Sequence, residues 1–167
     1  MGGAVRIRPA RPADLEEILS LCGEHAAFEK AAFSPREARG PLRRLLFGKR
    51  PRLRCLVAET GGRLAAYATF AAEISTWRAS LYLHMDCLFV REAFRNAGLG
   101  RRLLERVARA AREMGCSIVE WQTPAWNADA MRFYDRAGAV GSPKMRYRWT
   151  LRTRKRAAAR AAAPTAR

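Results

Sequence analysis

Long apolar runs are missing from this sequence. No stretch reaches the roughly 20 residues that a membrane-spanning helix needs. The opening Met-Gly-Gly-Ala-Val-Arg also lacks the apolar core of a secretory signal peptide. We therefore expect no membrane partner and a cytoplasmic location. With 167 residues, 49% of them hydrophobic and 28% charged, the chain is long enough to bury the core of a globular domain.

Cysteine pairs at metal or redox spacing are also missing. The four cysteines are scattered through apolar patterns, and none forms a Cys-x-x-Cys pair. The two histidines, His25 and His84, do not join them at ligand spacing. We expect buried free thiols in a reducing compartment and no metal site. His25 falls at the edge of the apolar face of a predicted helix, where we expect an ordinary structural histidine.

Acidic residues are few. The chain has 15 Asp and Glu against 32 Lys and Arg, for a net charge of +17. Six of these charges lie in residues 152–167, which contain no acid, so the rest carries +11. The excess favours a polyanionic partner, and a phosphate-bearing cofactor is one. RNA-binding aromatic signatures and zinc knuckles are absent, which makes specific nucleic-acid binding the weaker interpretation.

Apolar periodicity and turn residues predict one domain over residues 1–151, followed by a disordered Ala/Arg-rich tail over 152–167. Gly40 and Pro41 mark a point where the second helix can break or kink. The predicted order, β-α-α-β-β-β-α-β-α-β, indicates an α/β (α+β) fold with helices on both faces of a mixed sheet. The expected strands are 5–8, 54–59, 64–72, 81–90, 116–123 and 145–151, and the expected helices are 14–29, 35–47, 99–114 and 127–137.

The most informative stretch is 80–105, which predicts a buried strand, a glycine-rich loop and the start of a helix. The first N–H groups of a helix lack intrahelical partners, and glycine lets an anion approach the backbone, so such a loop is a candidate anion site. The alternative is a packing loop with glycines for tight turns. A Gly-x-x-x-x-Gly-Lys-Ser/Thr loop and an early Gly-x-Gly-x-x-Gly are both absent.

Arg95, Gly98 and Gly100 form an Arg-x-x-Gly-x-Gly pattern after the apolar strand. This resembles the acyl-CoA-binding signature of the GNAT superfamily of N-acyltransferases, Gln/Arg-x-x-Gly-x-Gly/Ala. Further similar stretches are 7–14, 86–90 and 126–139, so the resemblance extends over about residues 5–151. It implies a mixed, mostly antiparallel central sheet flanked by helices, and acetyl-CoA as the acyl donor. Members of the family often pair as homodimers, although the sequence itself identifies no interface.

The chain looks most like the diamine/polyamine acetyltransferase branch, but it departs from that branch at three points. Cys87 replaces the second of two adjacent acids, Ser75 replaces an expected aspartate, and Leu81-Tyr82-Leu83 lies two residues further upstream than expected. These changes remove negative charge where a polycation would bind. The expected acceptor is therefore a small molecule with a primary amine: a diamine, an amino acid or an amine-bearing antibiotic.

The resemblance implies catalytic roles for Asp86 and Tyr134. A free amine is protonated near neutral pH, so a base must take its proton before it attacks the thioester. Asp86 aligns with the family's carboxylate base, and Tyr134 aligns with the tyrosine that protonates the departing thiolate. Strand alternation puts His84 on the same face as Asp86, as a rival base or a relay. The alternatives are a buried hydrogen-bonded pair for His84 and Asp86, and a packing role for Tyr134.

Backbone N–H groups around Leu88–Val90, freed by a bulge, are expected to stabilise the thioester oxygen. Asn127 is expected to bind the pantetheine arm or to cap the last helix. The residues expected to bind acetyl-CoA are Leu88, Phe89, Val90, Arg95, Asn96, Ala97, Gly98, Leu99, Gly100, Arg101, Asn127 and Phe133.

The acceptor pocket is expected from Glu29, Glu73, Trp77 and Tyr82. Two other functions stay open: a protein or peptide N-acetyltransferase, and a non-catalytic CoA- or nucleic-acid-binding module. Retention of both Asp86 and Tyr134 argues against a protein without catalytic activity.

Overall fold

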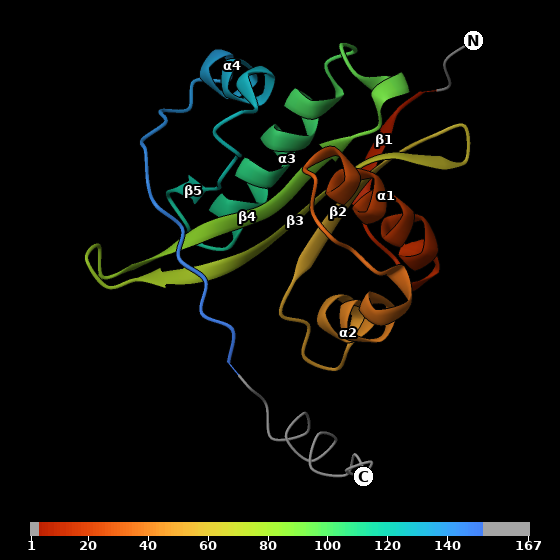
Figure 1. Ribbon diagram of the computed structural model, residues 1–167, viewed down its shortest axis with the longest axis horizontal. Helices are drawn as coiled ribbons and strands as arrows, with labels where there is room; N and C mark the ends of the chain where they lie inside the picture. Colours follow the sequence, from red (N-terminus) through yellow and green to blue (C-terminus); the bar gives the residue numbers. More distant parts are fainter. Residues whose placement is uncertain (1–3, 152–167) are drawn as a thin grey trace, which may run out of the picture.

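A mixed five-stranded sheet forms the centre of the computed structural model, which describes residues 4–151 (Figure 1). The strands follow chain order across the sheet, and only the last pair is parallel. The fold class predicted from the sequence is confirmed. The strands are β1 (Arg6–Pro9), β2 (Arg54–Thr60), β3 (Arg63–Ser75), β4 (Ser80–Val90) and β5 (Val119–Glu120).

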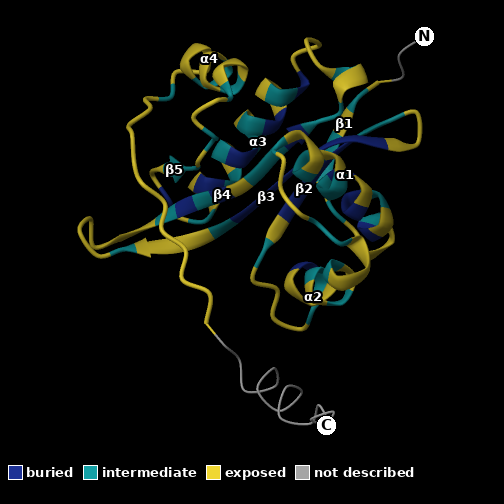
Figure 2. Ribbon diagram, in the orientation of Figure 1, coloured by how far each residue is buried: buried dark blue, intermediate teal, exposed yellow. Residues whose placement is uncertain are grey.

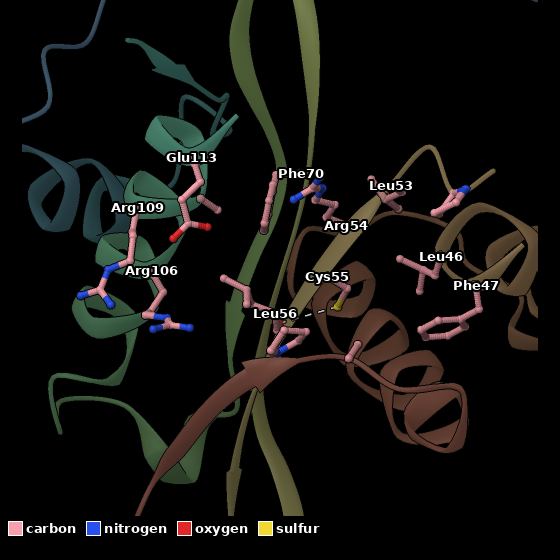
Figure 3. Close-up of a pocket in the computed structure, with 14 residues that line it drawn as sticks. Leu46, Phe47, Leu53, Arg54, Cys55, Leu56, Phe70, Arg106, Arg109 and Glu113 are labelled. Atoms are coloured by element: carbon pink, nitrogen blue, oxygen red, sulfur yellow. Dashed lines mark hydrogen bonds between the residues drawn. The ribbon is translucent and has the colours of Figure 1, made fainter. Parts of the chain in front are cut away.

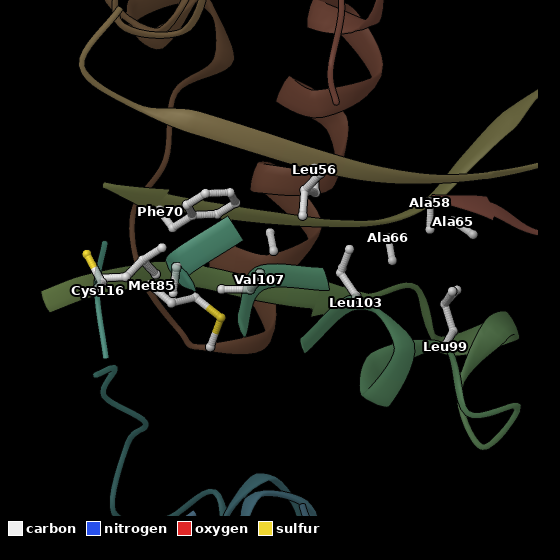
Figure 4. Close-up of a cluster of buried hydrophobic side chains, with 13 residues drawn as sticks. Leu56, Ala58, Ala65, Ala66, Phe70, Met85, Leu99, Leu103, Val107 and Cys116 are labelled. Atoms are coloured by element: carbon white, nitrogen blue, oxygen red, sulfur yellow. The ribbon is translucent and has the colours of Figure 1, made fainter. Parts of the chain in front are cut away.

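Helices cover both faces of the sheet (Figure 1). On one face, α1 (Leu15–Phe28) and α2 (Pro35–Phe47) pack on β2–β4. On the other, α3 (Leu99–Glu113) buries an apolar stripe against the sheet (Figures 2 and 4). The fourth helix, α4 (Ala128–Arg136), follows β5 and lies near the start of α3. The stripe on α3 consists of Leu99, Leu103, Val107 and Ala111.

Polar contacts fix the ends of the first two helices. Ser34 caps α2 by accepting a hydrogen bond from the backbone N–H of Glu37 at 3.4 Å, and the helix is continuous through Pro41. Before α1, Arg8 donates hydrogen bonds to both Asp14 oxygens at 2.7 and 2.9 Å. This ion pair lowers the pKa of Asp14. Arg8 also contacts Glu59 on β2 at 2.8 Å, so it ties β1 to the helix start.

Two predicted strands differ from the structure. The strand expected over 116–123 is reduced to β5. The closing strand expected over 145–151 is wrong, because no helix or strand forms between 139 and 151. Its apolar side chains stay in solvent: Tyr147 is 90% exposed and Trp149 is 88% exposed. Alternation along a chain predicts the two faces of a strand, but a strand also needs a neighbouring backbone edge. The predicted tail, 152–167, lies outside the described residues.

The four cysteines are free thiols. Cys55 and Cys116 are buried, and Cys22 and Cys87 are partly buried. Burial raises the pKa of Cys87 to about 12 and also raises those of Cys22 and Cys55, so these three thiols hold their protons at neutral pH. Within residues 4–151, no helix combines the length and the apolarity that crossing a bilayer requires.

Candidate active site

β4 carries a bulge at Asp86. Met85 pairs with Phe70, and Cys87 pairs with the preceding residue of β3, Thr69, which leaves Asp86 as the extra residue. A bulge of this kind bends a strand and re-aims its side chains. Asp86 is exposed. Its carboxylate acts electrostatically on Cys22 and His25 of α1, so it lies on the α1 side of the sheet.

The bulge is not at the position expected from the sequence. Leu88–Val90 keep regular partners on β3, from Ala68 to Ala66. Their other edge is open for a different reason. Within the described chain, β5 pairs with β4 only at Leu83 and His84, so β4 has no strand beside it from Met85 onward on that side. Backbone groups along this edge are therefore available to a ligand.

The glycine-rich loop leads into α3 through two residues with positive φ. Asn96 has φ of 62°, and Gly98, at the N-cap of the helix, has φ of 73°. No side chain caps α3 in the described structure. The N–H groups of its first turn are thus free to bind an anion, and the helix dipole favours one there. The side chain of Arg101 is 66% exposed and pairs with Glu105 at 3.1 Å.

Helix α4 packs against this loop. A Cβ atom built on Gly100 lies 3.4 Å from the Cζ of Phe133, so the phenyl ring covers the first turn of α3. Asn127 accepts a hydrogen bond from the backbone N–H of Ala130 at 3.2 Å. Of the two roles considered for Asn127, the structure shows the helix cap.

Tyr134 lies on α4 and packs against Trp121, with ring centroids 4.9 Å apart. Burial raises the pKa of Tyr134 to about 12, and the negative charge of Glu29 adds to the shift. The phenol therefore stays protonated at neutral pH and is able to donate a proton. Because Glu29 acts on both Tyr134 and His25, the end of α1 and the α4 tyrosine belong to one electrostatic cluster.

His25 is part of this cluster rather than an ordinary histidine at the edge of a helix face. Its side chain is 15% exposed. The Nδ1 atom lies 3.1 Å from the Tyr67 hydroxyl, and Nε2 lies 3.3 Å from a Glu29 oxygen. The imidazole also stacks on Phe89 of β4, with centroids 5.0 Å apart. The four-residue spacing of His25 and Glu29 was visible in the sequence, whereas a contact to Tyr67 on β3 was not.

Arg95 is exposed, but its side chain is held by contacts to β4. Its Nε donates a hydrogen bond to the carbonyl oxygen of Val90 at 3.0 Å. Its guanidinium lies 5.7 Å from the centroid of the Phe89 ring. The arginine of the motif therefore connects the loop to β4 in this structure.

The predicted acceptor residues separate into two groups. Glu29 lies at the end of α1 near Tyr134, whereas Glu73, Trp77 and Tyr82 lie on the β3–β4 hairpin, whose tip projects far from α1 (Figure 1). The Tyr82 hydroxyl donates a hydrogen bond to Glu73 at 2.6 Å. Trp77 is fully exposed. A shallow cavity of about 300 Å³ beside the hairpin is lined by Trp77 and Tyr82 but not by Glu29.

His84 lies two residues before Asp86 and pairs in register with Ala71 on β3 and Glu120 on β5. It is half-buried. Among residues 4–151, its imidazole makes no hydrogen bond or ion pair. The hydrogen-bonded pair of His84 with Asp86 that was considered from the sequence is therefore not formed.

A second cavity of about 270 Å³ lies between α2, β2 and the far half of α3 (Figure 3). Its walls include Arg54, Arg106 and Arg109 beside apolar residues such as Leu46. None of the predicted site residues lines it. The described residues also contain no group of three or more His, Cys, Asp or Glu that could hold a metal ion.

Comparison with solved structures identifies the class of fold. An aminoglycoside N-acetyltransferase solved with CoA superposes with a TM-score of 0.76 at 16% identity, over 92% of this chain and 97% of that one. A possible acetyltransferase from Clostridium difficile 630 gives the same TM-score at 18% identity, over 89% and 99%. The chain has the fold of these acetyltransferases.

Sequence comparison then identifies the family. The model described as the acetyltransferase (GNAT) family matches residues 14–139. Thialysine N-epsilon-acetyltransferase from Caenorhabditis elegans is 33% identical over 141 residues, which cover 84% of this chain and 86% of that protein. The Bos taurus enzyme of the same name is 31% identical over 143 residues, covering 81% and 84%. This chain belongs to the GNAT family and is an acyltransferase that uses acetyl-CoA.

Proposed function

We propose that residues 1–151 form one catalytic domain that transfers the acetyl group of acetyl-CoA to a primary amine of a small molecule. The observation that carries this proposal is the meeting of three features at β4. The bulge presents Asp86 on the α1 side, an uncapped helix start follows the strand, and a protonated Tyr134 lies in the same electrostatic cluster.

The loop supplies the cofactor site. The free N–H groups after Gly98 form a cradle for the pyrophosphate, and the positive φ of Gly98 turns them outward. Acetyl-CoA, when bound, supplies the thioester that is attacked. The open edge of β4 beyond His84 offers N–H groups that are able to donate hydrogen bonds to the thioester oxygen. These hydrogen bonds stabilise the negative charge that develops on this oxygen during the attack.

Asp86 is the proposed base. A primary amine has a pKa of roughly 10, so it reaches the site as an ammonium ion and must lose a proton before it can attack. Asp86 is exposed at the bulge, where it is able to accept that proton directly or through water. His84 remains the rival base, since it is free of other partners within the described chain.

Tyr134 is the proposed acid. Its pKa of about 12 keeps the phenol protonated, so it is able to donate a proton to the thiolate that leaves. A free thiol has a pKa of about 8.5, and a thiolate is therefore a fair leaving group without help. The acid speeds its departure but is not indispensable.

The acceptor class follows from charge and from the relatives. Glu29 places a carboxylate near Tyr134, which suits an ammonium group. Curated relatives include thialysine acetyltransferases and, over 46% of this chain, an Arabidopsis thaliana L-ornithine N5-acetyltransferase at 33% identity. We therefore propose a basic amino acid or a similar short amine as the substrate.

We also propose a cytoplasmic location for the protein, because a reducing compartment suits its four free thiols.

The test is a panel of amines assayed by loss of thioester absorbance from acetyl-CoA. Thiol reagents are avoided because the chain has four free cysteines of its own. The panel holds thialysine, ornithine, lysine, putrescine, spermidine, an aminoglycoside and a peptide mixture. Native protein is expected to turn over one small-amine class, and Asp86→Asn is expected to lower kcat by about 10²- to 10⁴-fold. Turnover of the peptides alone, or binding of CoA with no turnover, contradicts the proposal.

A homodimer is proposed as the working assembly. Trp77 on the β3–β4 hairpin and Trp149 in the unpaired segment are both largely exposed, and Lys144 of this segment lies beside the hairpin. Trp149 belongs to a run of exposed apolar side chains in this segment, with Met145, Tyr147 and Leu151. Such a run indicates a surface that another chain covers, and a second copy is the simplest source. Light scattering after size exclusion tests this. We expect native protein to be a dimer and Trp149→Arg to be a monomer. A monomeric native protein contradicts the proposed homodimer.

A further inference from the structure

His25 is held by neighbours on three different elements. Its ring lies against Phe89 of β4, at an interplanar angle of 21°. Nδ1 faces the hydroxyl of Tyr67 on β3, and Nε2 faces Glu29, the residue that follows α1. Both ring nitrogens thus have partners, as those of a buried histidine usually do, and one of these partners, Glu29, also acts electrostatically on Tyr134.

The two contacts favour one position for the imidazole proton. A carboxylate only accepts hydrogen bonds, so a proton on Nε2 suits the 3.3 Å approach of this atom to Glu29. In the neutral ring Nδ1 is then an acceptor, and the Tyr67 hydroxyl donates to it. Burial raises the pKa of Tyr67, so the hydroxyl keeps the proton that it donates. The result is a directed chain from Tyr67 through His25 to Glu29.

The surroundings of His25 shift its pKa in opposite directions. Burial lowers its pKa below the ordinary value of 6.5, and the positive charge of Arg95 lowers it further, whereas Glu29 and Asp86 raise it. The neighbouring thiols Cys22 and Cys87 are protonated at neutral pH and add no charge. The net shift is downward, so the imidazole is neutral at neutral pH.

We propose that His25 is a positioning residue of the acceptor site. Its Nε2–H holds the Glu29 carboxylate toward the acceptor's ammonium group. Because the imidazole is neutral, it adds no positive charge beside the acceptor's ammonium group. When His25 is protonated in acid, a positive charge sits beside the incoming cation and the acceptor binds more weakly. This inference rests on the proposed function, since it assigns a role within that acceptor site.

Three variants separate positioning from packing. His25→Gln keeps a donor near the Nε2 position and cannot be protonated. His25→Asn keeps a polar atom near Nδ1, so it retains only the contact to Tyr67. His25→Leu removes both contacts. Steady-state kinetics are measured from pH 5.5 to 8.5 with thialysine, or with the best amine of the panel, at saturating acetyl-CoA, and each variant is checked for folding by circular dichroism.

At pH 7.5 we expect His25→Asn and His25→Leu to raise the KM for the amine about tenfold, because each loses one hydrogen bond to a charged group. We expect kcat to change by less than about threefold. His25→Gln should keep a KM near that of native protein and lose the rise of KM below pH 6.5. Equal KM values for Gln and Asn, or an acid rise that persists in His25→Gln, overturn the proposal.

A second readout does not need turnover. The chain has only two histidines, so nitrogen-15 spectra of the imidazoles are assigned with His25→Gln and His84→Gln. His25 is expected as the Nε2–H tautomer with a midpoint below 6.5, moved lower still in Glu29→Gln. If Glu29→Gln leaves the titration midpoint of His25 unchanged, the proposal is contradicted. Absence of turnover on every amine instead contradicts the proposed function, while the titration still reports whether His25 holds Glu29.

Discussion

The guanidinium of Arg95 lies over the ring of Phe28, with its Cζ atom 5.0 Å from the ring centroid. Arg95 opens the glycine-rich loop and Phe28 is the last residue of α1. The contact therefore connects the proposed cofactor loop to the helix that carries His25 and ends just before Glu29. A cation over an aromatic face contributes about 0.5–1 kcal/mol at an exposed site. This energy is enough to shift the loop towards one conformation.

Replacement of Arg95 is predicted to affect both substrates. Arg95→Met keeps the aliphatic stem but removes the charge and the hydrogen bond to Val90. We expect the Kd for CoA, measured by calorimetry, to rise about tenfold, and the KM for the amine to rise with it. Arg112→Met is the matched control, since Arg112 is exposed in the last turn of α3, at the opposite end of the helix from the loop. An effect of Arg95→Met on CoA alone would show a direct phosphate contact instead.

The two glycines of the motif, Gly98 and Gly100, are predicted to respond differently to substitution by alanine. Gly98 has φ of 73° and open space around a built Cβ, so Gly98→Ala meets backbone strain but no clash. We expect it to cost about 1–2 kcal/mol of stability and to weaken CoA binding. Gly100 has no positive φ, and its Cβ would make an ordinary contact with Phe133. Gly100→Ala should therefore be neutral or slightly stabilising; urea unfolding measures both, and equal losses would refute this account.

Tyr134→Phe is predicted to lower kcat while leaving the protein folded. The ring contacts with Trp121 and Phe133 remain, and only the hydroxyl is lost. Because the thiolate is already a fair leaving group, we expect a fall at the low end of acid catalysis, about 10²-fold. The KM for the amine should stay within about threefold. A fall in kcat that vanishes with a donor whose thiol is more acidic supports the role, and an unchanged kcat excludes it.

Local patterns predicted most of the fold. The helices expected over 14–29, 35–47 and 99–114 each depend on a periodic pattern within one short segment, and each formed within a residue of its expected bounds. The pattern at 145–151 was equally clear but formed no strand. Its pairing depends on an edge elsewhere in the structure or in another chain, and no local signal specifies that edge.

Only the part of the site that is contiguous in the sequence was predicted. The loop from Arg95 to Gly100 is contiguous, so its helix start was visible in the sequence. The bulge at Asp86 depends on how β4 registers with β3, which alternation along one strand does not reveal. The contact between His25 and Tyr67 spans 42 residues, and it forms only because α1 packs on the sheet. Residues joined by tertiary packing are those that sequence reasoning missed.

The stability of the protein is predicted to fall in acid in two separate steps. The folded pKa of His25 lies below the unfolded value of 6.5, so the unfolded chain binds more protons as the pH falls. Its contribution is complete above about pH 6.5 and is lost as the pH falls through the folded pKa. Asp14 is also depressed, from an unfolded value of 3.8, so its contribution is complete above pH 3.8 and is lost below it.

Urea unfolding from pH 7.5 to 3 distinguishes the two steps. The free energy of unfolding of native protein should decline first as the pH falls below 6.5, and again below pH 3.8. His25→Gln should flatten only the first decline, because it removes a group that the unfolded state protonates more easily. Asp14→Asn should flatten only the second, at the cost of the ion pair with Arg8. If the first decline persists unchanged in His25→Gln, the imidazole is not held neutral by burial, and the directed chain from Tyr67 to Glu29 loses its physical basis.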